Sequence, residues 1–302
     1  MSAWIYTIMD YLAQAGLTVL TFLLGITTTG VMALSEPPAP PVIPDTPDAM
    51  TQEITVMSFN VWAPGKDSFG QRLPGAVQTI LKERPDSFGL QEASESWRFA
   101  LRRELRGDYA VACWKARYWG LQEGTPIFYL KDKYQLLEEG VFWLSDVPDK
   151  TSTGWDASMP RIAGYAVLKD KQTGFTYVHF NSHFDHIGPI ARANSSRMIA
   201  DRINEMGLPA VFTADVNASP DSLPTQYLEA GGLLDLRKVA GEADQGGTFH
   251  AYAGRSSVID YIYANHHMRL PETAKFWVIR DEYNGMFPSD HFAICATLTL
   301  AN

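Results

Sequence analysis

The sequence has few cysteines and an excess of acidic side chains. Only Cys113 and Cys295 occur among 302 residues, which excludes a disulfide framework and a four-cysteine zinc site. Both lie in apolar, strand-like runs, so we predict two buried free thiols rather than a single bridge. The 25 basic and 34 acidic side chains give a net charge of −9, which argues against a protein that coats duplex DNA through phosphate contacts. A nuclease remains compatible with this net charge, because the local electrostatic potential at the binding site matters more than the net charge of the whole chain.

Basic residues are absent from the first 65 positions. Within this part, residues 17–34 carry no charge over 18 residues, a length that suits a long signal-peptide core or nearly spans a bilayer. We therefore predict a signal peptide or membrane anchor over residues 1–34, which would engage the export machinery or the membrane; a buried core helix is the alternative. The protein would be exported, or anchored and extracytoplasmic. The mass of the mature chain would distinguish cleavage near Leu34 from a retained anchor.

Proline is concentrated directly after this segment. Residues 35–51 contain Pro37, Pro38, Pro40, Pro41, Pro44 and Pro47. Such spacing favours an extended tether, so we predict a Pro-rich linker over 35–51 and one catalytic domain over 52–302.

Beyond residue 52, short strands alternate with helices. Apolar runs at 54–60, 86–91, 140–144, 176–182, 210–214 and 257–263 predict strands, and apolar spacing at 72–83 and 191–205 predicts helices. Ser94 is a candidate N-cap for a helix that contains Trp97, Leu101 and Leu105. Many strands with interspersed helices predict an α/β fold, a four-layer sandwich of two packed mixed sheets flanked by helices.

Polar residues recur in strands or directly beside them. Asn60, Glu92, His183 and Asp215 each end or follow an apolar run, and Asp260 lies inside one. Each has a simple structural explanation by itself, for example a helix N-cap for Glu92. A carboxylate such as Asp260 in an apolar strand nevertheless needs a partner. Together with Asn217 and the Ser289-Asp290-His291 segment, these residues indicate a catalytic site.

The order of these residues resembles the endonuclease/exonuclease/phosphatase superfamily, the deoxyribonuclease-I-like metal-dependent phosphoesterases. The resemblance covers roughly residues 52–300. It rests on Asn60, Gln91-Glu92, Asp215-x-Asn217 and Ser289-Asp290-His291, with Ala214 where glycine is usual. The segment His183-Phe-Asp-His186 is similar to a bacterial-type subgroup.

The resemblance implies hydrolysis of a phosphoester with Mg²⁺ or Mn²⁺. It implies that Glu92 and Asp290 hold the ion, that Asp215 activates the attacking water, and that Asn217 binds phosphate. Further implied roles are Asn60 orienting water or phosphate, Arg161 clamping phosphate, His183 contacting the phosphate or leaving group, and Asp260 orienting His291. Glu123 would lie at or beside the metal. Asp185 and His186 would either line the pocket or pin the loop before the next helix.

The substrate class stays open at the level of sequence. A phosphodiesterase or nuclease-like activity comes first, and a phosphomonoesterase, sphingomyelinase or inositol-phosphate-type activity is the alternative. Two other classes are a zinc hydrolase built on His183, Asp185 and His186, and a binding module that kept the fold without catalysis. The partner is expected to be a nucleic acid, a phospholipid headgroup or a small phosphate ester, and the chain is expected to be a monomer.

Overall fold

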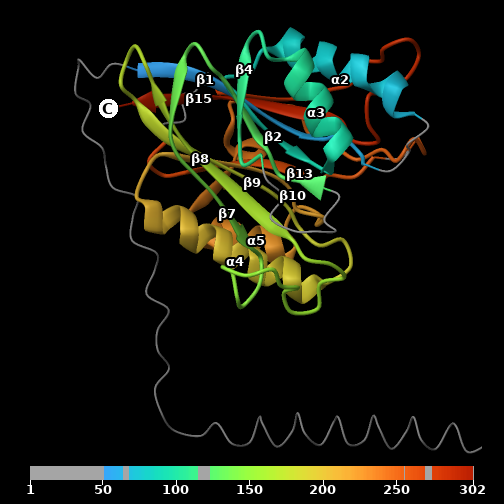
Figure 1. Ribbon diagram of the computed structural model, residues 1–302. Helices are drawn as coiled ribbons and strands as arrows, with labels where there is room; N and C mark the ends of the chain where they lie inside the picture. Colours follow the sequence, from blue (N-terminus) through green and yellow to red (C-terminus); the bar gives the residue numbers. More distant parts are fainter. Residues whose placement is uncertain (1–50, 64–67, 115–122, 255, 269–273, 302) are drawn as a thin grey trace, which may run out of the picture. The chain divides into compact units, whose positions relative to one another are not determined.

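The computed structural model describes residues 51–63, 68–114, 123–254, 256–268 and 274–301 (Figure 1). The predicted signal peptide or anchor, and the predicted linker up to residue 50, lie outside the described residues. In the ranges described, no helix is both long enough and apolar enough to cross a membrane.

The first sheet has seven strands in the order β12-β14-β15-β1-β2-β6-β4. Their bounds are β12 (Glu242–Ala243), β14 (Lys275–Ile279), β15 (Ala293–Ala301), β1 (Thr51–Asn60), β2 (Ser87–Gln91), β6 (Ile127–Leu130) and β4 (Tyr109–Ala112). Strand β1 pairs parallel with β2 and antiparallel with β15, so the sheet is mixed.

The second sheet has six strands in the order β11-β13-β10-β9-β8-β7. Their bounds are β11 (Leu233–Asp235), β13 (Asp260–Asn265), β10 (Ala210–Asp215), β9 (Thr176–His183), β8 (Ile162–Asp170) and β7 (Tyr134–Trp143). Strands β9 and β10 run parallel, whereas β10 and β13 run antiparallel. A separate short pair joins β3 (Ala93–Ser94) to β5 (Glu123–Gly124).

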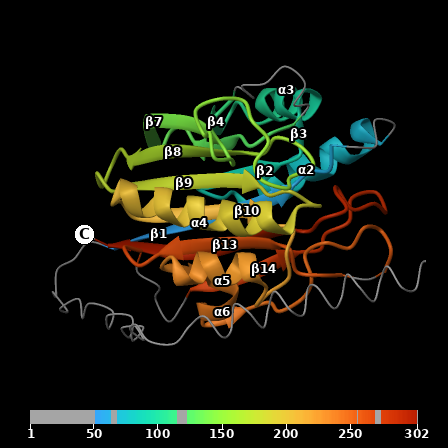
Figure 2. The same ribbon diagram turned by 90° about the horizontal axis from the view of Figure 1, so that it is seen from below.

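Helices cover the outer faces of both sheets. Figure 1 shows α2 (Phe69–Glu83) and α3 (Glu95–Glu104) on the side of the first sheet, and α4 (Pro189–Met206) with α5 (Leu223–Ala230) on the side of the second. Figure 2 shows α4 lying along β9 and β10, with the short α6 (Leu236–Val239) beyond α5. The α/β fold with two mixed sheets flanked by helices is therefore confirmed.

Apolar side chains fill the layers, and a polar chain crosses between the two sheets. Buried residues of β1, β2 and β15 pack with Tyr177, Val211 and Ile262 of the second sheet. Ser87 Oγ lies 2.7 Å from His179 Nδ1, and Gln91 Nε2 donates to Asn181 Oδ1 at 2.7 Å. These hydrogen bonds fix the position of β2 of the first sheet against β9 of the second sheet.

Several local expectations are confirmed and others shift. Ser94 caps α3 by accepting from the Trp97 amide, and Cys113 and Cys295 are buried free thiols. Strand β7 begins at Tyr134 rather than near residue 140, because the residues that follow buried Tyr134 are exposed or half-buried and form no apolar run. Strand β13 begins at Asp260, three residues later than the apolar run suggested.

Candidate active site

The candidate site lies where strands of both sheets end. Asn60 is opposite Gln91 in the parallel pair β1–β2, and Asp215 is opposite His183 in the parallel pair β9–β10. Strand β13 runs the other way, so its first residue, Asp260, is opposite Asp215. Parallel strands place their carboxyl ends at one edge of a sheet, which explains why residues distant in sequence meet here.

Asn60 connects the two sheets at this edge. Its Nδ2 donates to Glu92 Oε1 at 3.1 Å and to Asp215 Oδ2 at 2.9 Å, and its Oδ1 accepts from the Trp62 amide at 3.0 Å. Its side chain is buried. The amide therefore holds two carboxylates that come from different sheets.

Asp215 is buried and surrounded by nitrogen atoms. Its Oδ1 accepts from the Asn217 amide at 2.9 Å, and its Oδ2 lies 3.5 Å from His183 Nε2 and 3.8 Å from His291 Nε2. Burial and the negative charge of Asp260 raise the pKa of Asp215. A carboxylate whose affinity for a proton is raised suits a general base.

Asn217 and His183 form a second hydrogen-bonded pair. Asn217 Nδ2 donates to His183 Nε2 at 2.9 Å and to the Phe184 carbonyl at 3.0 Å. Asn217 has a φ of 52°, a left-handed conformation that asparagine tolerates better than most non-glycine residues. The pair lies directly beside Asp215.

His291 and Asp260 form a buried ion pair. His291 Nδ1 lies 2.9 Å from Asp260 Oδ2 and 3.1 Å from Asp260 Oδ1. Burial lowers the pKa of His291, but the charge of Asp260 and the hydrogen bond outweigh it and raise that pKa to about 10. The imidazolium therefore carries its charge at neutral pH. Its Nε2 faces Asp215 and also lies 4.0 Å from Asp290 Oδ1.

Glu92 and Asp290 supply two further carboxylates. Glu92 has a φ of 54°, and its Oε2 accepts from the Ala63 amide at 3.0 Å. Burial raises the pKa of Asp290 to about 6; the His291 charge opposes this shift, and the Glu92 charge adds to it. Two carboxylates close enough for the charge of one to act on the other form a site for a hard divalent cation with oxygen ligands.

A second set of ligand-type atoms lies alongside. In the part of the chain that the structure describes, atoms of Asp215, Asp260 and His291 lie within 4.8 Å of one another and could hold a metal ion. Sequence reasoning assigned these three to proton transfer and orientation. The proton on His291 Nδ1, shared with Asp260, leaves this nitrogen without a free lone pair for a metal.

Arg161, Asp185 and His186 form a neighbouring cluster. Asp185 Oδ1 accepts from the Ile187 amide at 3.0 Å and the Gly188 amide at 2.7 Å, so this carboxylate pins the loop before α4. Arg161 Nε lies 3.5 Å from Asp185 Oδ2, and its Nη2 lies 3.1 Å from His186 Nδ1. Arg161 is only 5% exposed, so a surface salt bridge does not describe it.

The zinc site considered from sequence finds little support in this geometry. Asp185 also accepts from Ser158 Oγ at 2.9 Å, and its hydrogen bonds outweigh the effect of burial and hold its pKa below the usual range. His186 is exposed. Glu123 lies in β5 opposite Ser94, and its side chain falls outside the described part.

Sequence reasoning missed Arg72 and the role of Ser289. Ser289 Oγ donates to the Asn60 carbonyl at 2.7 Å, which ties the end of β1 to the segment before β15. Arg72 is buried and donates to carbonyl oxygens of both segments. The sequence feature that could have identified Arg72 is its position on the apolar face of α2, at helical spacing from Ala76 and Ile80.

Comparisons with known proteins identify the family of this chain. The model of the Endonuclease/Exonuclease/phosphatase family matches residues 57–291. A family protein from Bacteroides thetaiotaomicron has 30% identity and a TM-score of 0.75, covering 83% of this chain and 99% of its own. A mannosyl-6-phosphatase from the same species has 32% identity and a TM-score of 0.72, covering 81% of this chain and 99% of its own.

More distant structures share the fold. Truncated TDP2 from Caenorhabditis elegans has 20% identity and a TM-score of 0.64, covering 82% of this chain and 97% of its own. No curated protein matched the sequence. The family match, the two packed sheets and the Asp215, Asp260 and His291 cluster together show that this chain belongs to the endonuclease/exonuclease/phosphatase family and has its phosphoester hydrolase fold.

Proposed function

We propose that this protein hydrolyses phosphoesters with a divalent cation, Mg²⁺ or Mn²⁺, held by Glu92 and Asp290. The observation that carries the proposal is the position of this carboxylate pair beside the His291–Asp260 ion pair and the buried Asp215. The fit to a hard cation follows from the donor set, which consists of oxygen atoms. When bound, such an ion neutralises charge on the phosphate and the leaving oxygen.

The side chains of this protein would perform the remaining steps. Asp215 accepts a proton from the attacking water, because its pKa is raised while Asn60 and the Asn217 amide fix its orientation. His291 presents a positively charged Nε2–H to the phosphate or leaving oxygen, and Asp260 keeps it charged and oriented. His183, Asn217 and the buried Arg161 are the remaining candidates to bind phosphate oxygens.

For the substrate we propose a small phosphomonoester of the sugar-phosphate class. The relative with 32% identity is a mannosyl-6-phosphatase, which favours the monoester alternative over the nuclease-like activity placed first from sequence. The net charge of −9 also argues against tight binding of duplex DNA. A phosphodiester is the second candidate, because the shared residues act on the phosphate and leave the leaving group unspecified.

A substrate panel tests this proposal. The full chain is incubated with hexose 6-phosphates, bis-p-nitrophenyl phosphate, sphingomyelin and single-stranded DNA, each with Mg²⁺ or Mn²⁺ and with EDTA. We expect phosphate release from the sugar phosphates, loss of activity in EDTA and in Glu92→Gln, and normal activity in the control Glu95→Gln, whose side chain is exposed on α3.

Other results of the panel would contradict the proposal. Activity that persists in EDTA, or in Glu92→Gln, would show that these residues do not support metal-dependent hydrolysis. Restoration by Zn²⁺ alone, lost in His186→Ala, would favour the zinc hydrolase. A failure to hydrolyse any substrate in the panel would favour a binding module.

A further inference from the structure

Arg72 occupies an unusual position for a charged side chain. It lies in the first turn of α2, is 1% exposed, and sits between two indole rings, with its Cζ 4.8 Å from the Trp62 ring centroid and 5.2 Å from that of Trp97. Burial of a guanidinium is unfavourable unless hydrogen bonds compensate for the lost hydration. The contacts of Arg72 should therefore indicate what it contributes.

These contacts reach two separate chain segments. Arg72 Nη1 donates to the Val61 carbonyl at 2.7 Å and to the Pro288 carbonyl at 3.2 Å, and Nη2 donates to the Trp62 carbonyl at 2.9 Å. One segment follows β1, and the other precedes β15. A planar guanidinium fork can hold several acceptors in fixed directions, whereas a lysine ammonium is a compact point charge on a flexible stem.

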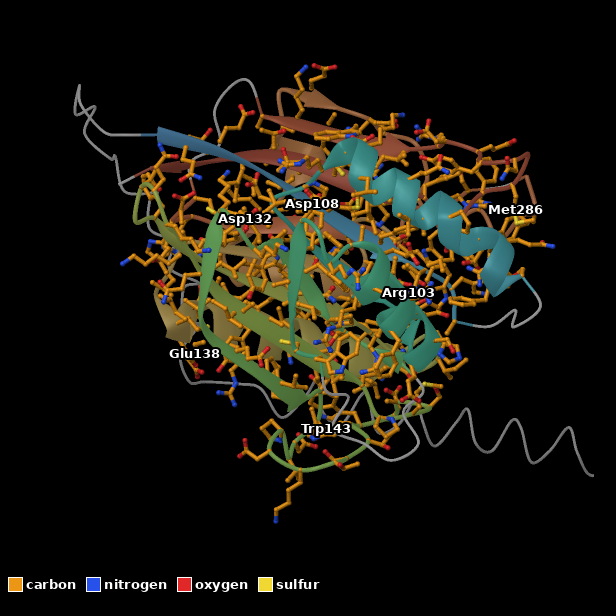
Figure 3. The ribbon with its side chains drawn as sticks, turned by 45° about the horizontal axis from the view of Figure 1, so that its top comes forward. Arg103, Asp108, Asp132, Glu138, Trp143 and Met286 are labelled. Carbon is orange, nitrogen blue, oxygen red and sulfur yellow. The ribbon has the colours of Figure 1, made fainter. Side chains whose placement is uncertain are left out.

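Each segment also positions a candidate metal ligand. After β1, the Ala63 amide donates to Glu92 Oε2, and the Trp62 amide donates to Asn60 Oδ1. Before β15, Pro288 stands two residues ahead of Asp290. Figure 3 shows Met286, in the same segment, beside the end of α2, and Thr79 of α2 donates to Tyr283 Oη at 3.2 Å.

The first segment is also held in a strained conformation. Trp62 has a φ of 56°, in the left-handed region that is unfavourable for a bulky residue. Such a conformation persists only when neighbours enforce it. Arg72 does so twice, through the Trp62 carbonyl and by packing on the Trp62 ring.

We propose that Arg72 is a positioning residue that sets the separation of Glu92 and Asp290 by joining the segments on which they depend. The inference rests on the proposed function, in which these two carboxylates hold the cation. Charge alone predicts that loss of the Arg72 charge would tighten metal binding, because the guanidinium lies near both carboxylates and repels a cation. The two contributions can therefore be separated by experiment.

The first test is Mn²⁺ binding by the full chain, measured by titration calorimetry. Arg72→Lys keeps the charge and removes the fork, and we expect the dissociation constant to rise about 10- to 100-fold, the usual cost of losing a residue that orients a metal ligand. The matched control is Arg237→Lys. Arg237 is also buried, donates to the Asp244 and Gly246 carbonyls, and packs 4.7 Å from the Phe276 ring, so it should leave the constant unchanged.

Arg72→Gln removes the charge and gives the sharper contrast. Positioning predicts weaker Mn²⁺ binding in this variant, whereas loss of a repelling charge predicts tighter binding. Tighter or unchanged binding in folded Arg72→Gln and Arg72→Lys would overturn the proposal.

Amide hydrogen exchange without metal separates this proposal from the proposed function. We expect faster exchange at residues 61–63 and 289–291 in Arg72→Lys, and wild-type exchange there in Arg237→Lys. A wild-type chain that binds no Mn²⁺ would contradict the proposed function, and the exchange rates would still decide the role of Arg72. Exchange that is unchanged in both segments would show that Arg72 does not hold them.

Discussion

At the scale of single residues, Asp215 collects the interactions that define the site. It accepts from Asn60 of the first sheet and from the Asn217 amide, and it faces the imidazole nitrogens of His183 and His291. Its pKa is raised because it is buried close to Asp260. Removing its charge should affect chemistry far more than folding.

Asp215→Asn tests this expectation. The amide keeps the shape of the side chain but cannot accept the proton of the attacking water, so we expect kcat to fall about 10²- to 10⁴-fold, with KM nearly unchanged. Steady-state kinetics at saturating Mn²⁺ measure this, and circular dichroism reports on the fold. The control Asp201→Asn, at an exposed position of α4, should leave kcat unchanged. A kcat near that of the wild type would remove Asp215 from the role of base.

At the scale of elements, strand β2 and the second sheet approach each other closely at Gly89. A Cβ built there would lie 2.2 Å from Thr213 Oγ1 and 2.3 Å from Asn181 Oδ1. Thr213 and Asn181 belong to the polar chain between the sheets, in which Gln91 takes part through Asn181. Gly89 therefore allows the two sheets to meet directly beneath Gln91 and Glu92.

Gly89→Ala should separate the sheets at this point. We expect the free energy of unfolding to fall by about 1–3 kcal/mol, because the methyl group has no room among the buried polar groups. Urea denaturation measures the change. Gly70→Ala is the matched control: its Cβ meets no atom within 4 Å and it lies in the first turn of α2, so we expect stability to change little. Equal stabilities of the two variants would contradict the close approach.

At the scale of the whole molecule, the buried polar chain makes stability depend on pH. His179 is fully buried between Ser87 Oγ and Thr213 Oγ1, at 2.7 Å and 2.9 Å, and burial lowers its pKa to about 3. The unfolded chain would bind a proton there near pH 6.5, while the folded chain would not. The contribution of His179 to the free energy of unfolding is therefore fully present above pH 6.5 and is lost as the pH falls towards 3.

The variant His179→Gln measures this contribution. We expect it to be less stable than the wild type at pH 7.5, since the hydrogen bonds are imperfectly replaced. Between pH 6 and pH 4, however, the wild type should lose up to about 1.4 kcal/mol more per pH unit than the variant. Urea midpoints across this range supply the comparison. Parallel pH profiles would show that His179 does not resist protonation in the folded state.

The sequence by itself determined the fold class and pointed to most members of the candidate site. Apolar runs and helical spacing indicated the strands and helices, because burial leaves a period of two or 3.6 residues along the chain. The polar residues Asn60, Glu92, Asp215 and His291 stood out because each interrupts or ends such a run. The first half of β7 escaped notice because most of its side chains are exposed or half-buried, so burial left no strand period there.

Only the tertiary structure decided how these residues are paired. Asn60 holds carboxylates from both sheets, and this depends on the strand register and sheet packing that bring Asn60 and Asp215 together across 155 positions of the sequence. Arg72 follows the same logic. Its sequence position marks it as one charge on an apolar helix face, and its partners become known only when the ends of β1 and the start of β15 meet above it. The periodicity of apolar residues along the chain indicates which side chains are buried. It does not indicate which residues contact one another, because those contacts depend on how the elements pack.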